Sequence, residues 1–148
     1  MKISIKLAPF YLFILLISSL CISNSLHASQ DIKSWEEVPV IDFNRIIQKA
    51  NESGEKWVYK PEFYIFNLFD LTALKKISYE FNVDNIEKPK NIDIRILRDG
   101  FLDDSVRGDI HQLKLKLNNK MIWKIVSIKK AISCWRNNQL IYSKETCP

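Results

Sequence analysis

Residues 91–100 read NIDIRILRDG and residues 111–120 read HQLKLKLNNK, and in both stretches apolar and polar side chains alternate. A period of two predicts a half-buried β-strand. The same period appears in KKISYEFNV at 75–83, and MIWKIVSIKKAISCW at 121–135 predicts a fourth strand that starts at Ile122 and Trp123. Its apolar side switches around Val126 and Ser127, which indicates a β-bulge. The sequence therefore predicts an antiparallel meander of four strands.

Upstream of these strands the periodicity is helical. VPVIDFNRIIQKANESG at 38–54 predicts an amphipathic helix, with Asp42 placed to cap its start and Gly54 to end it. KPEFYIFNLFD at 60–70 predicts a short helix with Pro61 at its first position, although Tyr64 and Ile65 would equally suit a strand. Helices followed by a meander indicate an α+β domain whose helices pack on one face of the sheet.

The N-terminal stretch has the order of a secretory signal: Lys2 and Lys6, the uncharged run LAPFYLFILLISSL at 7–20, then LHASQ at 26–30. We predict a signal peptide over 1–28 and a single α+β domain over 29–148. The alternative is an uncleaved membrane anchor. Cys21 is assigned to the apolar core of the signal, because a lipid-attachment signal needs a small residue where Leu20 stands. An exported protein, periplasmic or extracellular, is expected, or a membrane-anchored one if the segment is retained.

Cleavage after Ala28 would leave 20 basic and 17 acidic residues, a balance too even to predict nucleic-acid binding. Cys134 and Cys147 would be the two remaining cysteines. Thiols oxidise after export, so we expect these two to form a disulfide that fastens a polar tail. One histidine and two oxidised cysteines are too few for a structural zinc site, and no phosphate-binding loop is seen. Neither a metal nor a cofactor is predicted.

Two stretches carry a resemblance, DGFLDDSVRGDIHQLKLKL at 99–117 and the ending from WKIVSIKKAISCW at 123–135 to Cys147. They resemble small secreted bacterial proteins of uncharacterised activity that have a DG(F/L)LDDSVRG-like segment, a Trp-centred strand, a Cys-Trp pair and a C-terminal Cys. In that group a Gly- and His-rich loop often follows the Cys-Trp pair, whereas RNNQLIYSKET stands here. The matching residues are Asp99, Gly100, Asp103, Asp104, Ser105, Val106, Arg107, Gly108, Trp123, Cys134, Trp135 and Cys147.

The order of helices and then a curved meander also resembles the cystatin-like roll of the nuclear transport factor type. In that fold a long helix lies in the concave side of a bent sheet. The resemblance implies a fold and not an activity, because that fold hosts both enzymes and binding modules.

RDGFLDDSVRGD at 98–109 places Asp99, Asp103, Asp104 and Asp109 close together in the chain. Such carboxylates could offer oxygen ligands to Ca²⁺, but their spacing is not that of the helix-loop-helix calcium site. Turn chemistry explains the same residues, because Asp and Ser side chains bond to their own backbone and Arg107 can pair with a carboxylate. The interpretation we favour is an ordered turn without a metal.

His111 is the catalytic candidate of the sequence. It could act as a general base oriented by Asp109 or Asp104, with Ser105 as the nucleophile. On a strand, residues 109 and 111 point to the same side, so an Asp-His pair is geometrically possible. A strand histidine with a structural role is the commoner case. A small hydrolase or isomerase is therefore the alternative function, behind a non-enzymatic one.

Binding candidates come from the polar faces of the strands and from the aromatic residues before them. Arg95, Lys114, Lys116 and Lys124 would form a basic stripe on the outer face of the sheet if successive strands pair. Trp57 and Tyr59 are candidates for the rim of a pocket at the mouth of the roll. The favoured function is an exported, non-enzymatic binding or accessory domain, with an unidentified protein or a small apolar ligand as partner.

Overall fold

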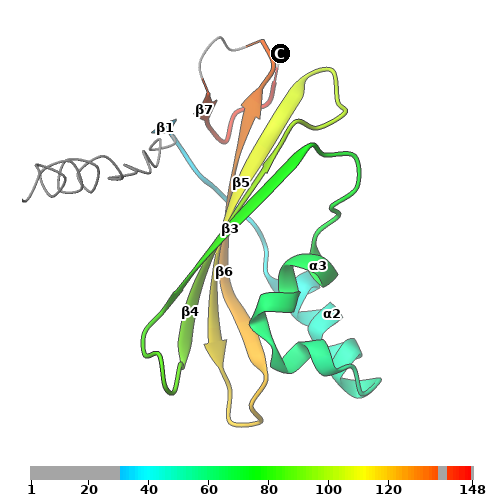
Figure 1. The fold of residues 1–148 in the computed structure, drawn as a ribbon, viewed down its shortest axis with the longest axis vertical. Coiled ribbons are helices and arrows are strands. Elements are labelled where there is room, and N and C mark those ends of the chain that lie inside the picture. Colours follow the sequence, from blue (N-terminus) through cyan, green and yellow to red (C-terminus); the bar gives the residue numbers. More distant parts are fainter. Residues whose placement is uncertain (1–30, 137–139, 148) are drawn as a thin grey trace, which may run out of the picture.

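A computed structural model describes residues 31–136 and 140–147 (Figure 1). The predicted signal peptide over 1–28, its cleavage after Ala28 and the assignment of Cys21 lie outside these residues. A long, twisted antiparallel sheet carries two α-helices beside one of its ends, which confirms the predicted α+β class. The elements are β1 (Asp31–Ile32), β2 (Glu36–Glu37), α2 (Ile41–Glu52), η1 (Lys56–Tyr59), η2 (Pro61–Phe63), α3 (Tyr64–Leu68), β3 (Lys76–Val83), β4 (Asn91–Asp99), β5 (Val106–Leu117), β6 (Trp123–Cys134) and β7 (Ile141–Tyr142).

The main sheet has the strand order β2-β6-β5-β4-β3, and neighbouring strands run antiparallel. The strands from β3 to β6 lie where the alternating pattern predicts them. The sheet has five strands instead of the predicted four, because Glu36 and Glu37 of β2 pair with Lys130 and Lys129 of β6. Two residues are too few for an alternating pattern to show. A separate pair joins β1 and β7 in parallel.

The alternation of the central strands places their apolar side chains under the helices. Ile92, Ile94 and Ile96 of β4 are buried, as are Leu113 and Leu115 of β5. The predicted bulge is present in β6, because Lys114 pairs with Ser127 while the next residue, Leu115, pairs with Ile125. Val126 is therefore the extra residue, and the bulge returns the apolar side chains of β6 to the core face.

The first helix begins one residue before the predicted cap. Val40 occupies the N-cap position of α2 without a side-chain cap, so the prediction that Asp42 caps the helix is wrong. Asp42 lies in the first turn, where a carboxylate favours the helix dipole, and it pairs with Arg45 at 2.8 Å. Gly54 follows the helix with a φ of +78°, a conformation that glycine adopts at little cost. Among the described residues, no helix is long and apolar enough to cross a membrane.

The second helical stretch is confirmed as a helix, with Pro61 opening the 3-10 turn η2 and α3 following directly. Tyr64 and Ile65 are completely buried in α3. The Tyr64 hydroxyl lies within hydrogen-bonding distance of two backbone carbonyls, at 2.8 Å from Val58 O and 2.9 Å from Trp123 O. One side chain therefore ties the helical segment to the start of β6.

The C-terminal segment is fastened by the predicted disulfide. Cys134 and Cys147 are bonded with their Cα atoms 5.6 Å apart. Tyr142 of β7 is also completely buried, in a second small core with Ile110 and Ala131. The sequence predicts a polar tail that is held by the disulfide. The structure shows that the Tyr142 ring holds it as well.

Candidate functional site

Asp109 and His111 of β5 lie close together, as their spacing predicts, and both side chains are buried. Arg98 of β4 donates hydrogen bonds to both Asp109 oxygens, from Nε at 2.8 Å and from Nη2 at 2.6 Å. His111 Nε2 lies 3.1 Å from Asp109 Oδ2. We call Arg98, Asp109 and His111 the polar trio.

The polar trio is closed in by its neighbours. Arg98 Nη1 donates to the backbone oxygen of Asp70 at 2.7 Å, and the rings of Phe69 and His111 make an edge contact with centroids 4.9 Å apart. Burial by itself would raise the pKa of Asp109, but the hydrogen bonds from His111 and Arg98 outweigh burial and lower that pKa to about 2. This geometry is that of a buried ion pair that joins β4, β5 and the chain after α3.

The other residues of the predicted catalytic and calcium sets lie in or beside the turn between β4 and β5, where most of them bond to neighbouring groups of the chain. Asp104 is exposed there, whereas Asp103 Oδ1 accepts the backbone N–H groups of Ser105 and Val106 at 2.8 and 2.6 Å. Asp99 pairs with Arg107 at 3.2 Å. In the described ranges no group of three or more His, Cys, Asp or Glu residues is placed to hold a metal ion.

The four basic candidates lie on the sheet face opposite the helices. Lys116 stands beside Lys124 across the β5–β6 pair, and Lys114 stands beside Asp93 across the β4–β5 pair. Arg95 is aligned with Gln112, and Gln112 with Lys129, a basic residue that the sequence analysis did not include. Lys129 reaches Glu37 of β2 at 3.2 Å. The stripe is thus interrupted by carboxylates.

The two aromatic candidates have different surroundings. Trp57 packs against the main core and makes an edge contact with the Tyr64 ring at 5.2 Å. Tyr59 is exposed, and its hydroxyl donates to Asn51 Oδ1 at 3.1 Å. Neither residue lines the groove described next.

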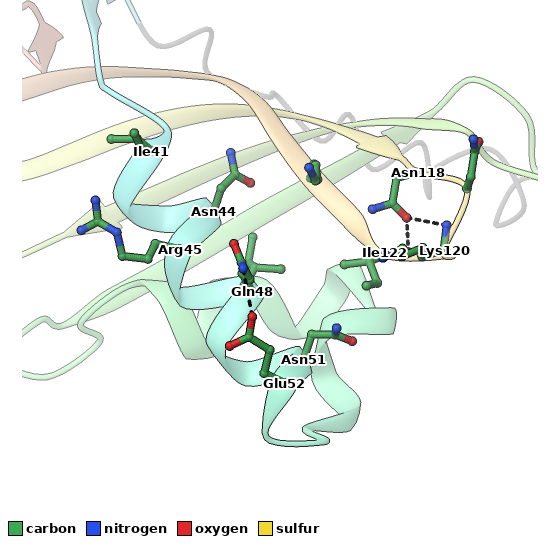
Figure 2. Close-up of a pocket in the computed structure, with 12 residues that line it drawn as sticks. Ile41, Asn44, Arg45, Gln48, Asn51, Glu52, Asn118, Lys120 and Ile122 are labelled. Atoms are coloured by element: carbon green, nitrogen blue, oxygen red, sulfur yellow. Dashed lines mark hydrogen bonds between the residues drawn. The ribbon is translucent and has the colours of Figure 1, made fainter.

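A groove of about 840 Å³ lies between α2 and the turn that joins β5 to β6 (Figure 2). We call it the α2–turn groove. Three isoleucines line the groove, while its remaining lining residues are amides or charged. The lining consists of Ile41, Asn44, Arg45, Ile47, Gln48, Asn51, Glu52, Asn118, Asn119, Lys120, Ile122 and Lys124.

Both walls of the α2–turn groove are held in place by side-chain hydrogen bonds. Asn44 of α2 donates to Ile125 O at 2.8 Å and accepts from Ile125 N at 3.0 Å. Its side-chain amide thus bonds to the backbone of β6 as a neighbouring strand would. On the opposite wall, Asn118 Oδ1 accepts the N–H groups of Lys120 and Ile122 at 2.9 and 3.0 Å (Figure 2). A site with two fixed walls needs little ordering when it binds.

Charge is unevenly distributed over the groove. On α2, Arg45 pairs with Asp42, and Gln48 donates to Glu52 at 2.9 Å. The wall opposite α2 is formed by the β5–β6 turn and the start of β6, and we call it the turn wall. It carries Lys120 and Lys124. Lys124 also borders a second hollow of about 300 Å³ on its other side, which is lined by Lys116, Leu117, Asn118, Asn119, Lys124 and Val126. The turn wall is therefore cationic on both sides.

Sequence reasoning placed Lys116 and Lys124 in a basic stripe but missed the groove. The groove forms where α2 meets a turn that lies more than sixty residues later in the chain. Amides and lysines on a helix and in a turn look like ordinary surface residues, so no local pattern marks the site. Comparisons with protein-family models, with curated proteins and with solved structures found no match for this chain.

Proposed function

We propose that this protein is an exported, non-enzymatic binding module that holds an acidic, extended segment of a partner protein in the α2–turn groove. The observation that carries the proposal is the groove itself, about 840 Å³ with both walls fixed by hydrogen bonds. The predicted signal peptide and the Cys134–Cys147 disulfide support export, because disulfides persist in oxidising compartments.

The chemistry of the lining favours a peptide segment over a small apolar ligand. Pockets for small ligands are enclosed and lined mostly by apolar side chains. Here Ile41, Ile47 and Ile122 are the apolar members of a lining that is otherwise amide or charged. Amides can bond to a peptide backbone, and Lys120 and Lys124 would attract carboxylates. An acidic segment with a few apolar side chains matches both features.

A hydrolase built on His111 has less support. The carboxylate that would orient His111 is already held by two hydrogen bonds from Arg98. His111 is buried against Phe69, and its partners within the polar trio come from the sheet itself. A general base must reach a proton of the substrate, and a buried strand residue under an aromatic ring is poorly placed to do so.

For the fold, our proposal is a cystatin-like roll. Its support is the chain order of helices before strands and the position of α2 and α3 beside the twisted sheet (Figure 1).

The test is site-specific photo-crosslinking in the native host. A photoreactive residue replaces Gln48, which lines the groove, and in a matched variant it replaces Lys49, which is exposed on the same helix outside the groove. We expect a discrete crosslinked product from position 48 and none from position 49. Equal products from the two positions, or no product from position 48, would refute the proposal.

The crosslinked partner is then purified and its binding measured by calorimetry. Lys124→Glu reverses a charge on the turn wall and should weaken binding by about tenfold, more at low salt than at high salt. Lys88→Glu, in the turn between β3 and β4, changes the net charge equally and should leave the affinity unchanged. An identical loss in both variants would mean that binding follows net charge and not the groove.

A further inference from the structure

The two edges of the main sheet differ in how far their backbone groups are paired. At one edge, β2 pairs with β6, Val38 N donates to Ile128 O at 2.9 Å, and Asn44 bonds to the backbone of Ile125. At the other edge lies β3, which pairs with β4 over eight residues without a register shift. Within the described residues no strand pairs with the outer side of β3. In the described part of the chain, the outer edge of β3 is therefore open to a further strand.

The backbone of β3 presents a regular set of bonding groups to the outside. Asp84 N donates to Asn91 O, which places the peptide groups of the even-numbered residues toward β4. The odd-numbered residues 77, 79, 81 and 83 consequently direct their N–H and C=O groups outward. Natural edge strands are usually protected by proline, a bulge, shortness or charged side chains. β3 has neither proline nor bulge, and its two charged residues, Lys76 and Glu80, have opposite signs.

An exposed aromatic cluster lies next to this edge. Tyr79 of β3 is 47% exposed and Phe66 of α3 is 55% exposed. The rings of Phe66 and Tyr79 are in edge contact at 6.4 Å, and those of Tyr79 and Phe81 at 5.6 Å. A contiguous apolar patch beside an open strand is typical of a surface that another chain covers.

We propose that β3 pairs with β3 of a second copy of this chain, antiparallel about a two-fold axis through Ser78, so that the two sheets join into one. A two-fold contact uses the same patch on both copies, so the strand must be complementary to itself. The pleat adds a second condition, because opposite side chains must lie on the same sheet face. Axes centred on Ser78, Tyr79 or Glu80 meet the second condition.

Charge selects among these three registers. With the axis at Ser78, Lys76 of each copy stands opposite Glu80 of the other copy, which gives two ion pairs. Ile77 of each copy stands opposite Tyr79 of the other. Opposite charges and aromatic–aliphatic pairs are both favourable across strands. With the axis at Glu80, two carboxylates face each other, which is unfavourable. That register would also place Lys76 opposite Asp84, but the Asp84 carboxylate already accepts hydrogen bonds from Lys90 N and the Asn91 side chain. With the axis at Tyr79, Lys76 meets Asn82 and the ion pairs are lost.

The register is tested by disulfide trapping of the full exported chain. Ser78 would meet its own counterpart in a non-hydrogen-bonded pair, with Cα atoms about 4.5 Å apart, within reach of a disulfide. Ser78→Cys should therefore give a covalent dimer under a glutathione redox buffer at micromolar protein. In Asn82→Cys, on the same strand and face, the two thiols would be about 26 Å apart and should not bond. Mass spectrometry of the native Cys134–Cys147 peptide checks that the new thiol has not exchanged with it.

The interface is tested without any cysteine by sedimentation velocity. The unmodified chain should show a concentration-dependent dimer. Lys76→Glu places like charges opposite each other and should raise the dimer dissociation constant by about tenfold, whereas Lys88→Glu, exposed in the β3–β4 turn, should not. Circular dichroism shows that both variants are folded. A monomer at all concentrations, equal trapping of the two cysteine variants, or trapping through Glu80→Cys instead of Ser78→Cys would overturn the proposal.

Discussion

Asp109 illustrates what a buried charge requires. Its carboxylate is almost completely removed from water, and the free-energy cost of that burial is offset by Arg98 on two oxygens and by His111 on one of them. The alternation of β5 indicated that residues 109 and 111 share a face. It did not indicate Arg98, because the partner strand and its register decide which cation faces the carboxylate.

The first prediction concerns this carboxylate and acid. The pKa of Asp109 is lowered from 3.8 to about 2, so its contribution to stability is complete above pH 4 and is lost as the pH falls toward 2. The free energy of unfolding should drop by about 2 kcal/mol over that range from this group. Denaturant titrations at pH 2, 3, 4 and 7 measure the drop.

The control for this prediction is a pair of asparagine variants. Asp109→Asn should lower the free energy of unfolding at pH 7 by about 3–5 kcal/mol, because Arg98 is left buried without its counter-charge, and should flatten the acid dependence. Asp42→Asn removes an exposed ion pair on α2 and should cost about 0–1 kcal/mol. A steep acid dependence that persists in Asp109→Asn would assign the effect to another group.

The second prediction concerns Trp123, which is buried where β6 begins and belongs to the main core. Trp123→Ala should lower the free energy of unfolding by about 3–5 kcal/mol, because a large side chain is removed from a packed core. Trp135→Ala removes an exposed ring that bonds to Asp103 O, and should cost less. Near wild-type stability of Trp123→Ala would contradict the assignment of the core face.

At the level of elements, alternation predicted the strands best where they are long. The bulge at Val126 was also visible, because the apolar pattern of β6 shifts by one position there. A second bulge near Arg107 was not predicted. It lies between Val106 and Gly108, where a Cβ on Gly108 would come within 2.3 Å of Arg98 O. The two-residue strands β1, β2 and β7 follow from chain contacts and not from a local pattern.

The third prediction tests how α2 completes the sheet. Asn44→Ala removes two hydrogen bonds to the backbone of Ile125 and should lower the free energy of unfolding by about 2 kcal/mol. The amide hydrogen of Ile125 should then exchange faster with solvent, which hydrogen-exchange mass spectrometry detects. Asn51→Ala on the same helix removes an exposed bond from Tyr59 and should change neither measurement by as much. Unchanged exchange at Ile125 in Asn44→Ala would show that the edge is protected by other means.

At the scale of the whole molecule, two cysteines were enough to predict the disulfide, because export and a count of two leave one pairing. The candidate site was not predictable in the same way. Lys116 and Lys124 were identified as binding candidates, but the groove beside Lys124 exists only once α2 is packed against the β5–β6 turn. Tertiary contacts between distant segments create such sites, and no periodicity in a single segment contains that information.

The fourth prediction concerns the closing of the C-terminal segment. Cys147→Ser should lower the free energy of unfolding by about 3 kcal/mol. Without the bond, the unfolded chain regains the conformational entropy of the loop between Cys134 and Cys147, which are 13 positions apart. Reductant should lower the melting temperature of the wild type to that of Cys147→Ser, whereas the melting temperature of Cys147→Ser should not change with reductant. Equal melting temperatures in all four measurements would show that Tyr142 alone holds the segment.

The parallel pairing of β1 with β7 also fixes where the described chain begins relative to the groove. Asp31 of β1 pairs with Ile141 of β7, and these two strands lie at the end of the sheet remote from the β5–β6 turn (Figure 1). A twelve-residue strand such as β5 spans about 40 Å. If the segment before residue 31 were kept as a membrane anchor, the point of attachment and the α2–turn groove would lie at opposite ends of the sheet. A tethered form would then have the length of the sheet between its attachment and its proposed binding groove.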